Sequence, residues 1–208
     1  MNDLEAIFLI SPWLSIGVWL VLYVADYYLT VWAAILYRQG ANAHVVFEGS
    51  YELTPQFQKD IDGLRRFSPR FLGYVVLSTG IVGGLWYVAN RWPDWRNMFL
   101  LAYGGLVFRQ LAVLVRHARN IALFRRLREH KGVEGRISYS TWLTLEMSWV
   151  ELLFMALLLL AAAGVAGRMT LYGGAFAVFV TGLEHRKMSK KKLADMKKTQ
   201  SGQSAPGD

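Results

Sequence analysis

Apolar residues in this chain are concentrated in five long segments, at about 12–37, 71–89, 97–115, 140–165 and 169–183, which are separated by short charged stretches. A helix that crosses a membrane needs about 20 mostly apolar residues. The first four segments are long enough, whereas the fifth is short and could instead insert only halfway. The pattern predicts an all-α integral membrane protein, in which residues 1–187 form a bundle of five transmembrane helices, or at least four.

Composition agrees with this class of protein. Charged residues make up 18% of the chain, against about 25% in soluble domains. Aromatic residues reach 14%, which suits anchoring at two membrane surfaces. Disulfides and thiolate metal sites are excluded because there is no cysteine. The four histidines lack the spacing of metal ligands, and no phosphate-binding or dinucleotide motif occurs, so we expect no metal and no cofactor.

Lysine and arginine alternate from one loop to the next. None precedes the first segment, five follow it, two follow the second, seven follow the third, one follows the fourth and seven follow the fifth. Positive residues are retained on the cytoplasmic side. The alternation therefore predicts an N-terminus outside and a C-terminus in the cytoplasm, in a multi-pass protein of a prokaryotic inner membrane.

The positive loops have further features of their own. Phe57, Ile61, Leu64 and Phe67 share one face of a helix over about 54–67, which predicts an amphipathic helix on the inner leaflet. The basic residues predict contact with anionic lipids. No nucleic-acid-binding motif accompanies them, so we expect no nucleic acid partner. The tail, 188–208, is predicted to be disordered. The candidates for lipid-headgroup contacts are Arg65, Arg66, Arg116 and Arg119.

Four ionisable residues lie within the apolar segments, where such residues are rare and usually face the bundle interior. Counting helical rise from the cytoplasmic ends places Asp26 and Glu151 near the membrane centre, with Arg109 and Glu146 nearer the cytoplasm. Two carboxylates at one depth suggest a cation- or proton-binding site, with Arg109 and Glu146 as an inner gate or charge pair. Thr30 and Ser148, on the same helix faces as the two carboxylates, complete the candidate site.

Structural explanations for the same residues stay open. Glu151 could extend its side chain to the membrane surface. Asp26 could be a neutral or arginine-paired carboxyl group that only fixes helix packing. Small residues spaced four apart predict close helix contacts and allow a homo-oligomer. They are Gly80 and Gly84, Ala163 and Gly167, and Gly173, Ala177 and Thr181.

The leading functional hypothesis is passage of a cation or proton through a channel or transporter. One alternative is an enzyme that acts on lipid headgroups at the cytoplasmic face, with Arg109, Arg116, His117 and Glu146 around a phosphate. No nucleophile stands out for such chemistry, so the sequence favours a protein that is not an enzyme. The other alternative is a scaffold or assembly subunit of a membrane complex.

Overall fold

The computed structural model describes residues 3–48, 57–130 and 134–203, which are helical apart from two short strands and the connections. The helices are α1 (Asp3–Ile10), α2 (Pro12–Arg38), α3 (Gln58–Asp62), α4 (Pro69–Arg91), α5 (Arg96–His130), α6 (Thr141–Ala166) and α7 (Met169–Gln203). The remaining elements are the 3₁₀ turns η1 (Ala41–Ala43) and η2 (Pro93–Trp95) and the strands β1 (Val45–Phe47) and β2 (Ile137–Tyr139).

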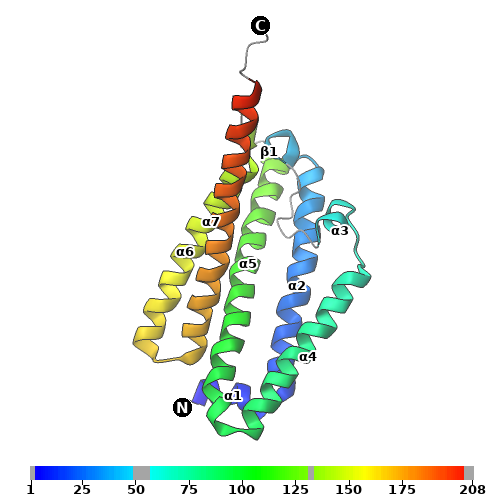
Figure 1. The fold of residues 1–208 in the computed structure, drawn as a ribbon. Coiled ribbons are helices and arrows are strands. Elements are labelled where there is room, and N and C mark those ends of the chain that lie inside the picture. Colours follow the sequence, from blue (N-terminus) through cyan, green and yellow to red (C-terminus); the bar gives the residue numbers. More distant parts are fainter. Residues whose placement is uncertain (1–2, 49–56, 131–133, 204–208) are drawn as a thin grey trace.

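Four helical segments are long and apolar enough to cross a membrane: α2, α4, α6 and the stretch 93–129 that contains most of α5. This agrees with the prediction of an all-α bundle with at least four such helices. α7 begins where the fifth segment was predicted but is not among these four. The start of α1 and the end of α7 lie at opposite ends of the bundle (Figure 1). Membrane insertion and orientation stay predictions.

The helix ends follow from local sequence. α2 and α4 each have proline at the first helical position, where its missing N–H costs nothing and its fixed φ suits the helix. The Ser68 hydroxyl caps α4 by accepting a hydrogen bond from the Phe71 backbone N–H at 3.1 Å. α6 ends at Gly167, whose φ of 62° is a left-handed conformation that glycine adopts without strain.

α5 lies at the centre of the bundle. It packs against α2 and α4 on one side and against α7 on the other, while α6 packs against α7 (Figure 1). The described residues of α2 therefore face α5 rather than α6. Polar residues on the face of α5 toward α2 and α4 therefore have different neighbours from those on the face toward α7.

α5 and α7 run in the same direction and touch backbone to backbone. A Cβ atom added to Gly173 would lie 1.8 Å from the Leu101 carbonyl oxygen, and one added to Gly104 would lie 2.1 Å from the Thr170 oxygen. Further along the same contact between α5 and α7, the Ala177 side chain lies against Gly105. The predicted small-residue face on the fifth segment is thus a close helix contact. Gly80 and Gly84, by contrast, have open space around them within this chain.

Two connections outside the main helices are tied together by a small parallel sheet. Val45 pairs with Ile137 and Phe47 with Tyr139. Behind the strands, an aromatic and aliphatic cluster joins the ends of α2 and α5, and Phe124 is its most buried large side chain. This cluster accounts for the apolar residues among the arginines of the third loop, since α5 continues to His130 as one helix.

The structure differs from the sequence-based expectation in two segments outside the main helices. Within 57–67 only α3 is helical, and Ile61 is 1% exposed in a cluster with α2, so part of the predicted apolar face packs inside the protein. Contact of this segment with a membrane surface stays a prediction. The chain leaves the helix at Gly63 and Leu64, and Leu64 has a φ of 51°. Thr54 and Pro55 lie outside the described residues. The predicted disordered tail continues α7 as far as Gln203, because Lys, Ala, Leu and Met are strong helix formers.

Candidate functional site

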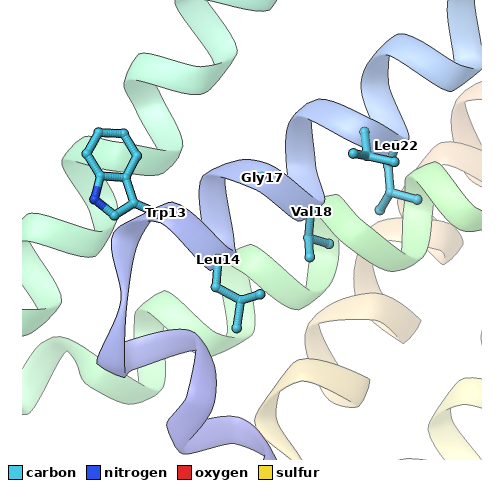
Figure 2. A pocket seen from close by; sticks show the side chains of 6 residues that line it. Trp13, Leu14, Gly17, Val18 and Leu22 are labelled. Carbon is cyan, nitrogen blue, oxygen red and sulfur yellow. The ribbon is translucent and has the colours of Figure 1, made fainter.

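The outer surface of α2 carries a hollow of about 350 Å³ that offers no chemistry. All its lining residues belong to α2, and Figure 2 shows Leu14, Val18 and Leu22 directed from one side of the helix, with Gly17 between them. No titratable side chain lines it. An open apolar surface of this kind suits contact with lipid tails.

A second cavity, of about 270 Å³, lies inside the bundle between α2, α4 and α5 and is bordered by α3. We call it the Asp26 cavity. Its polar lining comes from α2 and α5, whereas its aromatic lining comes from α2, α4 and the segment that begins α3. The polar residues are Asp26, Thr30, Arg109, Gln110 and His117, and the aromatic residues are Tyr23, Tyr27, Phe57, Phe71 and Tyr74.

Asp26 is paired with His117. The His117 Nε2 atom lies 3.0 Å from the Asp26 Oδ1 atom and 2.9 Å from the Thr30 Oγ1 atom. The Thr30 hydroxyl donates its own proton to the Asp26 backbone carbonyl at 2.8 Å. Nε2 therefore faces two oxygen acceptors and must carry the proton, which leaves the Nδ1 atom as the basic position of a neutral imidazole. His117 and Asp26 are largely enclosed, at 14% and 28% side-chain exposure.

Three buried polar atoms of residues that line this cavity have no aligned hydrogen-bond partner among the described residues. They are Asp26 Oδ1, Gln110 Nε2 and His117 Nδ1. Gln110 is only 4% exposed, so its amide is well removed from bulk solvent. Burying such a group without a hydrogen-bond partner costs about 1–3 kcal/mol. Together with the Asp26–His117 pair, these buried polar groups make the residues around this cavity the candidate site.

The aromatic wall is packed into one assembly. Phe71 stacks on Tyr27 with ring centroids 4.2 Å apart and on Tyr23 at 5.7 Å. Phe57 meets Phe71 and Tyr74 edge to face. The loop before α4 is fixed to this wall, since the Tyr27 hydroxyl donates to the Arg65 carbonyl at 2.8 Å. The rings thus form a rigid surface opposite the polar residues.

Glu151 belongs to a different cluster, on the other side of α5. Its carboxylate lies 3.5 Å from Arg116 and also contacts Arg119. The structure does not bring Asp26 and Glu151 together, because α5 stands between the helices that carry them. Ser148 was predicted to belong to the same site as Glu151. It is 1% exposed, and its hydroxyl oxygen lies 2.6 Å from the His185 Nδ1 atom.

His185 lies two residues beyond the predicted fifth span. Burial lowers its pKa from 6.5 to about 4, and the positive charges of Arg116 and Arg109 act in the same direction. His185 is consequently neutral at physiological pH. It can exchange a hydrogen bond with Ser148 but carries no charge there.

Arg109 is not paired with Glu146. Its Nε atom donates to the Thr181 hydroxyl at 3.1 Å. Along the bundle, Asp26 lies level with His117, two turns further along α5 than Arg109, so the two residues are not ordered as the depth count expects. That depth count took Arg116 as the end of the third span, whereas α5 continues as one helix to His130. The proposed phosphate-binding group of an enzyme is not assembled, because Arg116 and His117 point to different partners.

The remaining candidates are surface residues or paired residues. The Arg65 side chain is 64% exposed and lies 3.3 Å from Asp60, and Arg66 is exposed. Contact of these arginines with anionic lipids stays a prediction. In the part of the chain that the structure describes, no group of three or more His, Asp or Glu residues could hold a metal ion.

Sequence reasoning missed Gln110 and the aromatic wall, and it did not connect His117 with Asp26. A signal was available, because Gln110 and His117 are seven residues apart and so share a helix face. Tyr23, Asp26, Tyr27 and Thr30 likewise form one face of α2, at i, i+3, i+4 and i+7.

Comparison of the chain with known protein families, with characterised proteins and with solved structures found no match. The functional argument therefore starts from the geometry of the Asp26 cavity.

Proposed function

We propose that this protein exchanges a proton or another small cation across a membrane, at a site centred on Asp26 and His117. The observation that supports this is an aspartate–histidine pair 3.0 Å apart, lining a cavity inside a bundle of apolar helices. Acidic residues and histidines in such positions are typical of proton relays and ion pathways. Asp26 keeps the role predicted for it, while His117 replaces Glu151 as its partner.

Asp26 and His117 have different roles in the proposed exchange. The Thr30 hydroxyl accepts a hydrogen bond from the Nε2–H group of His117, with the Asp26 carboxylate beside it, which fixes the tautomer of the neutral imidazole. The Asp26 carboxylate then stabilises the protonated imidazole beside it. When His117 is neutral, the same carboxylate is free to balance a different cation. Arg109 and the phenols of Tyr23, Tyr27 and Tyr74 are the other ionisable groups that face this cavity.

Flux through reconstituted liposomes tests this proposal. With a pH gradient and a trapped pH-sensitive dye, the wild-type protein should raise proton flux above that of empty liposomes, and a cation series should reveal competition. Asp26→Asn and His117→Gln should each abolish the flux while the protein still melts as a folded bundle. Glu146→Gln is the matched control, because Glu146 does not line the cavity.

Two results would contradict the proposal. One is a wild-type protein that leaves liposomes as tight as empty ones to protons and cations. The other is an Asp26→Asn protein with wild-type flux. If both cavity variants lose only stability or assembly with a partner protein, the polar residues serve helix packing and the protein is a scaffold.

A further inference from the structure

The Asp26 cavity has the chemistry of a binding site for a small organic cation. It is lined by one carboxylate, five aromatic side chains, the Gln110 amide and the His117 imidazole. We infer that this cavity binds a protonated primary or secondary amine, with Asp26 as the counter-ion and the aromatic rings around the alkyl or aryl part. This inference rests on the proposed function, because it names the cation exchanged at the same site.

The hydrogen-bonding atoms favour a cation that carries N–H groups. The Asp26 carboxylate lines the cavity and is a hydrogen-bond acceptor. An ammonium group with N–H bonds can donate to this carboxylate, whereas a quaternary ammonium cannot. A hydrogen bond between an ammonium group and a carboxylate is charge-assisted and therefore among the stronger kinds.

The walls favour an organic cation over a metal ion. Metal cations such as Mg²⁺ and Ca²⁺ require several oxygen ligands, but this cavity offers one carboxylate among aromatic rings, Ile61 and Val113. The faces of Tyr and Phe rings attract ammonium groups through their quadrupoles, most strongly where water is excluded. Phe71 lies at the centre of this wall, since it stacks on both Tyr23 and Tyr27.

The size of the cavity limits the guest. A volume of about 270 Å³ is just below the range of ordinary ligand pockets, which starts at about 300 Å³. A lipid or a peptide is too large, and a single-ring or short-chain amine fits. Gln110, at 4% exposure, can accept from such an amine through its carbonyl or bind an oxygen of the guest through its amide N–H groups.

Arg109 is the one feature that opposes a cation. Its side chain lines the cavity, but its Nε atom is bonded to Thr181 of α7, so the guanidinium is held toward the far side of α5. Its charge still lowers the affinity of the cavity for an ammonium group. Removing that charge should therefore strengthen amine binding, which is the opposite of the effect expected for Asp26.

Calorimetric titration of the detergent-solubilised full chain with benzylammonium tests the inference, with micelles alone as the blank. Benzyl alcohol is the matched neutral probe, and it should bind at least about tenfold more weakly because it lacks the charge. Asp26→Asn should weaken benzylammonium binding by at least about tenfold, and Phe71→Leu several-fold. Arg109→Gln should tighten it. Melting curves check that each variant is folded.

The outcomes separate this inference from the proposed function. Equal affinities for benzylammonium and benzyl alcohol, or equal affinities of wild-type and Asp26→Asn protein for benzylammonium, would overturn the amine assignment. Proton flux that depends on Asp26 would survive that result. Charge-dependent binding without any flux in liposomes would leave the amine site in place and refute transport.

Discussion

Replacing Gly173 with alanine should separate α5 from α7. The new Cβ atom would lie 1.8 Å from the Leu101 carbonyl oxygen and 2.6 Å from its carbon. Ordinary van der Waals contact begins at 3.4 Å, so the two backbones must move apart by about 1.6 Å. Both colliding groups are main chain, so no side chain can rotate away to relieve the contact.

The expected cost follows from that displacement. Overpacking of a close-packed interior costs about 1–3 kcal/mol, and a backbone collision lies at the upper end. A gap of 0.5–1 Å already removes about a quarter to a half of each dispersion contact, so the neighbouring contacts at Gly104 and Gly105 weaken as well. Alanine regains up to about 1 kcal/mol through its better helix propensity. The net loss is about 2 kcal/mol, or roughly 4–8 °C in melting temperature.

Thermal melting of the detergent-solubilised protein, followed by tryptophan fluorescence, measures this loss. Gly80→Ala is the matched control, because a Cβ atom there meets nothing within 4 Å, and it should melt at or slightly above the wild-type temperature. Gly104→Ala should behave like Gly173→Ala, since its Cβ atom would lie 2.1 Å from Thr170. If Gly173→Ala melts together with Gly80→Ala, the two backbones are not in contact and the reasoning fails.

Three further predictions use the same melting assay. His185 is neutral in the folded protein down to about pH 4. The free energy of unfolding should therefore fall as the pH drops from 6.5 toward 4, by at most about 3 kcal/mol. His185→Asn should remove this part of the pH dependence. Glu5→Gln should lower the free energy of unfolding by about 1 kcal/mol, because the Glu5 carboxylate accepts a hydrogen bond from the Thr170 N–H at 2.9 Å at the start of α7. The control Glu184→Gln, at an exposed position, should leave it unchanged. Ser68→Ala should lower the free energy of unfolding by about 1–3 kcal/mol, because it removes the cap of α4 and the 2.6 Å hydrogen bond to buried Asp60. The control Ser138→Ala, at an exposed position, should leave it unchanged.

The main helices could be predicted from sequence because each corresponds to one long apolar run. The predicted segments 12–37, 71–89 and 140–165 match α2, α4 and α6 to within two residues at each end. The inner end of α5 was placed too early, since the arginines from Arg116 onward looked like a loop. Apolar residues spaced among those arginines are buried against β1 and β2, which is a tertiary contact that the local pattern does not reveal.

The candidate site could be predicted only in part. Asp26 stood out because it interrupts an apolar run, and it does line a cavity. Its partner could not be predicted from depth, because helical rise gives a height along the bundle but not the direction in which a side chain points. Asp26 and Glu151 were matched by height, while their helices lie on opposite sides of α5. The apolar face of 57–67 was recognised, but the choice between a membrane surface and α2 as its partner depends on how the chain returns to the bundle.

The parallel pairing of β1 with β2 has a consequence for biosynthesis. The two strands are roughly 90 residues apart, and the chain between them contains α4 and α5. At a synthesis rate of about 5–20 residues per second, β1 waits roughly 5–20 s before its partner strand exists. If both intervening helices cross the membrane, the strands emerge on the same side and can pair. If only one crosses, the strands are on opposite sides and cannot pair. Pairing of β1 with β2 therefore indicates that α4 and α5 have both been inserted.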